Sequence, residues 1–468
     1  MFTAMDLRNF KSWREAKIEF GHGRRDKNEL GGITGFFGTN SSGKSSLIQF
    51  LLLLKQSREE RDRSTVLQLN GPYVEMGLYS DVIHNAKTDE SIQWDISFVR
   101  DKELSLMDAE GSSTAIAARS NRFSISSEVS GDKWPNAPAY RMRSTFLEYS
   151  MSGMSFRLAR KAVNEAEYEL IAAGGSFEFV RNRGRAWPLP GPTRSYAFPD
   201  QARTYFQNAQ FLSDLETAYE AELDNLFYLG PLRVRPSRDY VWTGTRPADV
   251  GTAGERTIEA LVAATAMGEQ KSLGPKRRRR PLQEVVAHWL KHLGLINSFA
   301  VEEISPGTNR WVAKVRIHRN GPIVPLTDVG TGVSQVLPVI TLLQYVPEGA
   351  TVLLEQPEIH LHPLAQAELA DVIINAAVHR RVQIILESHS EHFVLRLQRR
   401  IAEEFISSDL VRLYFAEAVN GASRLIPLEV DAVGAIRNWP DKFMGDAFSE
   451  VAAAELRRIE RRETKSNG

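Results

Sequence analysis

Residues 38–45 read Gly38-Thr39-Asn40-Ser41-Ser42-Gly43-Lys44-Ser45, which fits the phosphate-binding loop pattern G-x-x-x-x-G-K-S, the Walker A motif. Residues 33–37 before it have the length and apolar character of a strand, and residues 47–55 after it favour a helix. Glycines allow successive backbone N–H groups to curl round a phosphate, and the helix N-terminus adds positive potential. The stretch therefore predicts a binding site for a nucleoside triphosphate.

Two side chains of this loop have distinct expected roles. Lys44 is expected to neutralise the β- and γ-phosphate oxygens, and the Ser45 hydroxyl to be a ligand for Mg²⁺. The expected nucleotide-binding residues of the loop are Gly38, Asn40, Ser41, Ser42, Gly43, Lys44, Ser45 and Ser46.

The composition limits the class of protein. The chain has 468 residues, no cysteine, 58 basic and 58 acidic residues, and 42% hydrophobic residues. The charge balance gives no general attraction to nucleic acid, and the lack of cysteine excludes disulfides and thiolate metal sites. No apolar run reaches the roughly 18 residues that a membrane-spanning helix needs, and no signal peptide is apparent. We expect a cytoplasmic protein with two or more lobes.

A second predicted strand, residues 351–354, ends in Glu355-Gln356-Pro357-Glu358. An apolar strand that ends in acids is typical of a Walker B site. Glu355 is expected to hold Mg²⁺ through water, and the next position normally carries the base that activates the attacking water. In this chain that position is Gln356. Glu355, Gln356 and Glu358 are therefore candidate catalytic residues.

The next predicted strand, residues 382–386, ends in Glu387-Ser388-His389-Ser390. The carboxyl ends of parallel strands meet at one edge of a sheet, so His389 is a candidate sensor of the γ-phosphate beside both Walker motifs. For His360, His362 and His392 a structural role is favoured.

Residues 326–338 place a glycine pair at the start of a predicted helix, shortly before the Walker B strand. A glycine-rich helix N-terminus attracts anions. The alternative is a turn and a helix start without function. We interpret the segment as a second phosphate-contacting site, whose candidate residues are Gly330, Thr331, Gly332 and Ser334.

These segments together resemble those of ABC-type ATPases of the SMC, RecF and OLD (overcoming lysogenization defect) class. Among these, the compact prokaryotic ATPases read Glu-Gln-Pro-Glu-x-His-Leu-His-Pro at Walker B, as residues 355–363 do here. Residues 7–13 are similar to the family's first strand, and residues 38–46 to its Asn-Ser-Ser-Gly-Lys-Ser-Ser loop. Residues 228–233 are similar to a segment between its two nucleotide half-sites, and residues 435–443 to its C-terminal domain of unknown function.

The resemblance implies ATP and Mg²⁺ as cofactors. It also implies a composite site, in which ATP on the Walker A loop of one subunit is completed by the signature helix of another. The active species is then a head-to-tail homodimer.

Two departures from the family pattern bear on activity. The signature usually offers Ser-x-Gly, whereas this chain has Gly330-Thr331-Gly332, so the hydroxyl for the γ-phosphate is missing or comes from Thr331 or Ser334. Gln356 replaces the usual catalytic glutamate, and an amide orients a water without taking its proton. We expect slow turnover unless Glu358 or His389 substitutes, although glutamine does position the attacking water in small GTPases.

The expected fold is α/β: an ABC-type P-loop ATPase head, similar to RecF and SMC heads, with an antiparallel β lobe and an inserted helical region. Residues 203–227 and 282–295 are predicted to be helical, and residues 310–318 to contain strands. The expected domains are an N-terminal ATPase half (1–90), a β-rich lobe (91–202), a helical insertion with a basic loop (203–300), a C-terminal ATPase half (301–425) and a tail domain (426–468).

Two further segments bear on partners. The basic run Lys276, Arg277, Arg278, Arg279 and Arg280 offers salt-dependent contacts to DNA phosphates, although such a run is more often a solvated loop. The charged segment 451–463 is expected to be a helix that packs or binds a partner. About sixty residues follow the strand of His389 and its helix, too few for the Toprim nuclease domain of OLD proteins. A nuclease would then be a separate chain.

The sequence therefore predicts a slowly hydrolysing ATPase that forms a homodimer or higher homo-oligomer through its ATP sites. By resemblance alone, it regulates a separate effector, a nuclease or a toxin, in prokaryotic anti-phage defence. Two alternatives stay open. ATP-dependent duplex binding would favour a RecF-like DNA repair or maintenance ATPase, and Gln356 is the sequence argument for an ATP-gated scaffold that scarcely hydrolyses.

Overall fold

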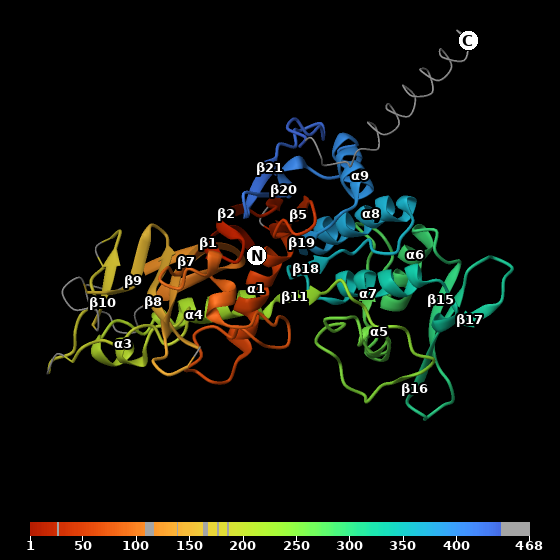
Figure 1. Cartoon of the computed structure of the whole chain (residues 1–468). Helices are drawn as coiled ribbons and strands as arrows, with labels where there is room; N and C mark the ends of the chain where they lie inside the picture. Colours follow the sequence, from red (N-terminus) through yellow and green to blue (C-terminus); the bar gives the residue numbers. More distant parts are fainter. Residues whose placement is uncertain are drawn as a thin grey trace, which may run out of the picture.

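The computed structural model describes residues 1–25, 28–107, 117–137, 139–161, 167–175, 177–184 and 187–440. Figure 1 shows an antiparallel sheet on the left, a mainly parallel sheet near the centre, and a helical region with short strands on the right. The predicted α/β class with an antiparallel β lobe is confirmed. None of the helices in these described ranges has both the length and the apolar character to cross a membrane.

The central sheet has six strands in the order β11-β18-β19-β5-β20-β21, of which only the last runs antiparallel. Every residue of β18 and β19 is buried, as expected for parallel strands that are covered on both faces. Because β19 lies between β18 and β5, the carboxyl ends of these three strands meet at one edge. The strands are β5 (Ile33–Gly38), β11 (Leu226–Leu229), β18 (Thr351–Glu355), β19 (Gln383–Glu387), β20 (Val411–Val419) and β21 (Ala422–Leu428).

A second sheet has seven antiparallel strands in the order β10-β9-β8-β7-β6-β1-β2. Residues 2–19 and residues 92–173 both contribute strands to it, and the predicted domain boundaries stay a prediction. Its strands are β1 (Phe2–Phe10), β2 (Trp13–Glu19), β6 (Ile92–Met107), β7 (Ala117–Lys133), β8 (Tyr140–Met151), β9 (Met154–Arg160) and β10 (Tyr168–Ala173).

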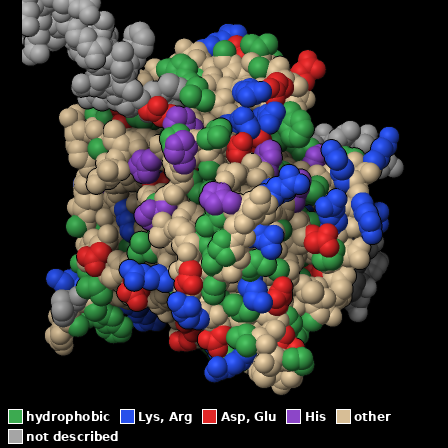
Figure 2. Space-filling view, turned by 90° about the vertical axis from the view of Figure 1, so that its right-hand side faces the viewer, with side chains coloured by type: hydrophobic (Ala, Val, Ile, Leu, Met, Phe, Trp, Pro, Cys, Tyr) green, Lys and Arg blue, Asp and Glu red, His purple; other side chains and the backbone are tan. Residues whose placement is uncertain are grey.

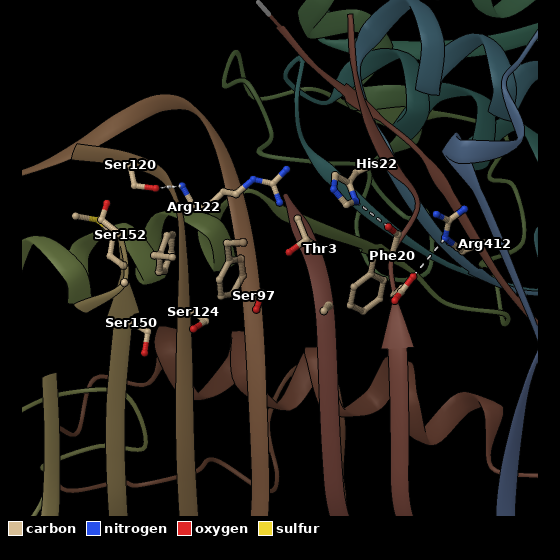
Figure 3. Close-up of a pocket in the computed structure, with 16 residues that line it drawn as sticks. Thr3, Phe20, His22, Ser97, Ser120, Arg122, Ser124, Ser150, Ser152 and Arg412 are labelled. Atoms are coloured by element: carbon tan, nitrogen blue, oxygen red, sulfur yellow. Dashed lines mark hydrogen bonds and ion pairs between the residues drawn. The ribbon is translucent and has the colours of Figure 1, made fainter. Parts of the chain in front are cut away.

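A polar groove of about 510 Å³ crosses one face of the antiparallel sheet. Ser97, Ser124 and Ser150 are paired in register across β6, β7 and β8, and Figure 3 shows them on neighbouring strands beneath Arg122. The groove therefore lies on the hydroxyl-bearing face of this sheet, whereas the opposite face is packed in the core.

Helix α1 (Lys44–Glu59) fills the space between the two sheets. The ring of Phe50 lies 5.2 Å from that of Phe10 and 5.5 Å from that of Trp94, both on the antiparallel sheet. The same hydrophobic core includes Leu353 and Ile385 of the parallel sheet. Burial on both sides holds the N-terminus of α1, and with it the loop at residues 38–43, in a fixed place.

The other face of the parallel sheet packs against a second core formed by most of the remaining helices. The helices of this second core are α5 (Thr257–Ala266), α6 (Leu282–His292), α7 (Thr331–Tyr345), α8 (Pro363–Arg380) and α9 (Glu391–Ala402). The helices α2 (Tyr79–Val82), α3 (Asp200–Tyr205) and α4 (Leu212–Asp224) belong to the first core, and 3₁₀ turns lie at His84–Ala86, Leu326–Asp328 and Ser408–Leu410. The short strands are β3 (His22–Arg25), β4 (Asn28–Gly31), β12 (Tyr240–Val241), β13 (Gln270–Lys271), β14 (Arg280–Pro281), β15 (Ser298–Glu303), β16 (Arg310–Arg316) and β17 (Ile323–Pro325).

The prediction of one continuous helix over residues 203–227 is wrong in the middle of that range. Residues 203–227 form the end of α3, the separate helix α4 and the start of β11, with a break at Phe206. The backbone of Phe206 forms a bridge with that of Arg181, and its ring lies 5.6 Å from that of Phe179. This tertiary contact overrides the helical spacing of the apolar residues. The predicted helix at 451–463 lies outside the described residues.

Candidate nucleotide-binding site

The loop between β5 and α1 has the backbone conformation that its glycines permit. Gly43 has φ 87° and Gly38 has φ 130°, in the region that side chains rarely adopt. A Cβ atom at Gly43 would lie 2.5 Å from the Ser423 hydroxyl and 2.6 Å from that of Ser12. The indole N–H of Trp13 donates to the Gly43 carbonyl at 3.0 Å. The N-terminal hairpin and β21 thus press on this loop, and only glycine fits at position 43.

Lys44 is folded onto its own loop. Its ammonium group donates to the carbonyl oxygens of Thr39 at 2.7 Å and Gly38 at 3.1 Å. Burial lowers the pKa of Lys44, and the nearby Glu387 carboxylate opposes this shift. Thr39, Asn40 and Ser41 at the tip of the loop are exposed. The Lys44 ammonium group is therefore already turned into the loop, where it could bind an anion.

Two carboxylates stand side by side where β18 and β19 end. Glu355 and Glu387 are register partners in these strands and both are buried. The Ser45 hydroxyl donates to Glu387 at 2.6 Å, and the Tyr228 hydroxyl donates to Glu355 at 2.7 Å. Burial raises the pKa of Glu355 to about 7; the hydrogen bond from Tyr228 opposes this rise and the Glu387 carboxylate adds to it. In this structure the contact of Ser45 is therefore with Glu387.

The turn after β18 is held from two sides. Gln356 has φ 45°, its N–H donates to the Glu387 carbonyl at 2.8 Å, and its side chain is half-buried. Arg233 donates to the carbonyl oxygens of Glu355 at 3.1 Å and Gln356 at 3.3 Å. The buried Glu358 carboxylate accepts from the Ser388 hydroxyl and from the His389 N–H, both at 2.8 Å. Glu358 thus joins the Walker B turn to the segment that follows β19.

His389 lies at the same edge of the sheet. Its Nε2 is 3.9 Å from a carboxylate oxygen of Glu387, and its pKa is lowered first by burial and then by the charge of Lys44. The structure therefore brings the loop, the two carboxylates and His389 together at one edge. His362 has a different position, as the N-cap of α8, where its Nδ1 accepts from the Leu364 N–H at 3.4 Å.

The predicted signature segment lies elsewhere. Gly330 is the N-cap of α7, Thr331 is exposed, and the Ser334 hydroxyl donates to the Thr331 carbonyl at 2.9 Å. Thr331 and Ser334 line a cavity of about 470 Å³. Residues 38–46 contribute nothing to this lining. Within one chain, the two predicted phosphate-contacting segments thus form separate surfaces.

Sequence reasoning missed three residues of the site, Glu387, Tyr228 and Arg233. Each stands in a stretch that the motifs include, but none was given a role. Glu387 could have been found, because an acid at the end of a strand next to the loop strand shares the edge of Walker B. Tyr228 and Arg233 could not, since their contacts depend on β11 lying beside β18.

Three family models match parts of the chain. Residues 4–150 match an "AAA domain" model, and residues 300–395 match a model described as "AAA domain, putative AbiEii toxin, Type IV TA system". Residues 406–453 match a "Protein of unknown function (DUF3696)". The two AAA-domain matches cover the loop and the Walker B edge. No curated protein matches.

Solved structures of SMC head domains are similar to this chain at low identity. A head bound to the C-winged helix domain of ScpA is 13% identical, with 92% of this chain and 98% of that chain covered and a TM-score of 0.44. The head from Thermotoga maritima is 11% identical, with 92% and 99% covered and a TM-score of 0.39. A Pyrococcus furiosus head with an extended coiled coil, bound to the C-terminal domain of ScpA, is 11% identical, with 98% and 99% covered and a TM-score of 0.44.

Proposed function

We propose that this chain, an SMC-, RecF- and OLD-like ABC-type ATPase, closes into a head-to-tail homodimer on ATP and thereby regulates a separate effector protein. The observation that carries the proposal is the separation of the two phosphate-contacting surfaces. The loop, Glu355, Glu387 and His389 share one edge, whereas Gly330 to Ser334 lie at a cavity that the loop does not reach. A composite site would need the second surface from another copy.

In this proposal the loop holds the triphosphate of ATP. The N–H groups of residues 40–46 and the Lys44 ammonium group bind the β- and γ-phosphate oxygens. The left-handed glycines and the inward-turned Lys44 fit a phosphate chain. Magnesium would be held by Ser45, Glu387 and Glu355, because hydroxyl and carboxylate oxygens are the ligands it prefers. The metal would neutralise charge that develops on the phosphates.

Hydrolysis in this site relies on orientation more than on proton transfer. Gln356 follows the metal carboxylate and can hold the attacking water through its carboxamide, without accepting the proton. Glu358 is occupied by Ser388 and the His389 backbone, which suits a residue that positions the switch segment. His389 lies near Glu387 and Lys44, where it can contact the γ-phosphate. We therefore propose slow turnover.

The nuclease or toxin class of the effector and its setting in anti-phage defence are taken from the resemblance of the sequence motifs. The model that matches residues 300–395 is described as a putative AbiEii toxin of a type IV TA system, which supports a toxin-linked role for this chain. ATP would draw two copies together because it binds the closed state more tightly than the open one. The effector would respond to the surface that changes on this closure.

A DNA-directed ATPase is the second candidate, favoured by one observation. Lys276 to Arg280 are exposed; the run follows β13, and its last residue, Arg280, begins β14. On the face shown in Figure 2, however, basic and acidic side chains are interspersed, so this face offers no uniformly positive surface to DNA. ATP turnover measured with and without duplex DNA separates the two, because only a DNA-directed ATPase is expected to respond.

Light scattering tests the dimer. Gly330 has ordinary backbone angles, and a Cβ atom there would meet nothing within 4 Å, so Gly330→Leu fits the isolated chain. In a composite site the leucine would stand in the path of the second copy's phosphates. We expect ATP with Mg²⁺ to double the mass of a Gln356→Ala background, which keeps the proposed metal ligands, and Gly330→Leu to prevent this. Gly321→Leu, on the turn before β17, is the control. A mass that ATP leaves unchanged in the background variant would refute the proposal.

A further inference from the structure

The segment that carries His389 is joined to the Walker B turn by a second link besides Glu358. Gln366 is a half-buried residue near the start of α8, and its side-chain N–H donates to the Leu361 carbonyl at 3.0 Å. Its side-chain oxygen accepts a hydrogen bond from the Ser390 hydroxyl at 2.7 Å. One side chain therefore bridges the end of the Walker B turn and the residue that follows His389.

The two bonds of Gln366 fix its side chain in one orientation. A carbonyl oxygen only accepts, so the amide nitrogen has to face Leu361 and the amide oxygen is left to accept from Ser390. The Ser390 hydroxyl in turn accepts from the Phe393 N–H at 3.1 Å, and Ser390 is the N-cap of α9. Its single hydroxyl proton is directed at Gln366. The start of α9 is therefore attached to α8, which lies beside it in Figure 1.

These bonds belong to a closed ring. The Ser390 N–H donates to the Ser388 hydroxyl at 3.0 Å, and that hydroxyl donates to Glu358. The Leu361 N–H donates to the Glu358 carbonyl at 3.1 Å, and the bridging amide of α8 closes the ring. The two serines are buried, whereas the side chain of His389 between them is 37% exposed. The ring therefore holds the backbone on both sides of His389 and leaves its imidazole accessible.

The position of His389 matters because its proposed contact has a short range. Its Nε2 lies 3.9 Å from a carboxylate oxygen of Glu387, at the edge of the sheet that also carries the loop. Protein N–H···O bonds have heavy-atom distances of about 2.7–3.2 Å, so a backbone shift of roughly 1 Å at His389 would break a bond to a phosphate oxygen. The links that hold this backbone therefore bear on what His389 can bind.

We propose that Gln366 is a positioning residue for His389, because its bonds to Leu361 and Ser390 hold the imidazole where it can contact the γ-phosphate of bound ATP. The proposal rests on the proposed function in one respect, that the loop binds ATP with its γ-phosphate at this edge. Dimer formation, hydrolysis and the effector do not enter. Without the amide, the ring opens between α8 and α9, and His389 loses its fixed position while the loop itself is unchanged.

Equilibrium binding of ADP and of a non-hydrolysable ATP analogue with an imido bridge tests this role. Both are measured in a Gly330→Leu background, which keeps a second copy away from the site. The preference is the affinity for the analogue divided by that for ADP. Gln366→Met keeps the length of the side chain and removes both hydrogen bonds, so the preference should fall about three- to tenfold while the ADP affinity stays within about twofold. Gln398→Met is the matched control and should leave the preference unchanged, because Gln398 is a half-buried glutamine on α9 that donates to the Gly434 carbonyl at 2.8 Å.

A double-variant cycle separates positioning from a merely structural role. His389→Ala should lower the same preference, since it removes the group that contacts the γ-phosphate. Adding Gln366→Met to His389→Ala should then change the preference no further, because the amide acts through the imidazole, whereas losses from an unrelated structural defect would add. Gln366→Glu is a second variant for the same cycle. It keeps the oxygen for Ser390, loses the donor to Leu361, and should lower the preference as Gln366→Met does.

Hydrogen exchange, measured by mass spectrometry, reports on the ring without any nucleotide. Two successive N–H groups, those of His389 and Ser390, donate within the ring. In the ligand-free chain, Gln366→Met should speed exchange over residues 388–390 on the order of tenfold, because local opening becomes easier. Exchange in the C-terminal half of α9, at residues 397–401, should stay as in the parent chain.

Three outcomes would overturn the inference. Gln366→Met could keep the full preference for the ATP analogue, its loss could add to that of His389→Ala, or exchange over residues 388–390 could stay as in the parent chain. Failure here is distinguishable from failure of the proposed function. A chain that light scattering shows to stay single with ATP refutes the dimer and leaves this link intact, and the exchange experiment needs no nucleotide.

Discussion

The two surfaces that are proposed to contact phosphate differ in how complete they are. At the edge of the parallel sheet, Lys44 is already bonded inside its loop and Ser45 already touches Glu387. At the cavity beside α7, Thr331 is exposed and the buried Arg233 keeps an unpartnered Nε among the described residues. The first surface is assembled within one chain, whereas the second leaves Thr331, which carries a hydroxyl, exposed at the N-terminus of α7.

This difference follows from where each surface gets its residues. The loop edge is built from three neighbouring strand ends, so its geometry is fixed by sheet register and by burial of α1 between the sheets. The cavity is built from a helix N-terminus, the segment after β11 and the turn after β18. In the proposed dimer, a site that is split in this way would let one copy hold a nucleotide while catalysis depends on a second copy.

The substitution with the largest expected effect, Lys44→Ala, disrupts the first surface and leaves the second unchanged. Lys44→Ala removes a cation that is expected to make two charge-assisted hydrogen bonds to phosphate, each worth about 1.5–3 kcal/mol, so ATP affinity should fall roughly 10²- to 10⁴-fold. The melting temperature should change little, because the ammonium group bonds only to its own loop. Equilibrium binding of a fluorescent ATP analogue measures this. Lys11→Ala is the control, because Lys11 bonds to Gln49 of α1, the helix that begins at Lys44. Equal ATP affinity in Lys44→Ala and in the parent chain would refute the assignment of the loop as the nucleotide site.

A second change sharpens the comparison within the loop edge. Glu355→Gln and Glu387→Gln should each lower Mg²⁺-dependent turnover on the order of 100-fold while sparing ATP affinity without metal. The neutral amides keep the size of the side chains and remove the charges that a divalent ion needs. Turnover as a function of Mg²⁺ concentration measures this, with the half-buried Glu368→Gln on α8 as control. Normal turnover in Glu387→Gln would show that its contact with Ser45 is structural.

The sequence predicted the loop edge well because its signals are local. The glycines, Lys44 and the apolar flanks each act within one strand–loop–helix unit, and the predicted strand at 33–37 and helix at 47–55 lie within β5 and α1. The contact of Ser45 with Glu387 depends on β19 lying between β18 and β5, which no spacing in the sequence specifies. Of the cavity, the sequence predicted only the part at the start of α7, as a phosphate-contacting segment, because Arg233 reaches the cavity through the pairing of β11 with β18. The helix predicted across Phe206 was wrong for the same reason, since a distant bridge decides that backbone.

A third change tests whether the loop edge lacks a base. Gln356→Glu places a carboxylate beside the attacking water, so turnover should rise about tenfold, which corresponds to about 1.4 kcal/mol of barrier. Gln356→Ala is the matched control and should lower turnover, because it removes the group that orients the water. Steady-state kinetics at saturating ATP measure both. An unchanged or lower rate in Gln356→Glu would mean that the glutamine is the proper orienting group or lies away from the water.

The smallest expected effect concerns the protonation of the metal site. Burial raises the pKa of Glu355 to about 7 from its ordinary 4.5, so the folded chain favours the protonated carboxyl. The free energy of unfolding of the ligand-free chain should therefore fall as the pH rises from about 4.5 to about 7, and this contribution is constant outside that window. Affinity for Mg²⁺ should do the opposite, because only the carboxylate is a ligand, and it should rise as the pH passes through about 7.

Tyr228 donates a hydrogen bond to this carboxylate, and Tyr228→Phe removes that support for the charged form. The pKa should rise further, and the midpoint of Mg²⁺ affinity against pH should move upward by roughly one unit, since a hydrogen bond to a charged group is worth about 1.5 kcal/mol. Tyr240→Phe, which changes a tyrosine whose hydroxyl accepts from the Ser237 N–H instead, should leave the midpoint in place. A midpoint that Tyr228→Phe does not move would separate Glu355 from the titration and leave Glu387 as the carboxylate that governs the metal.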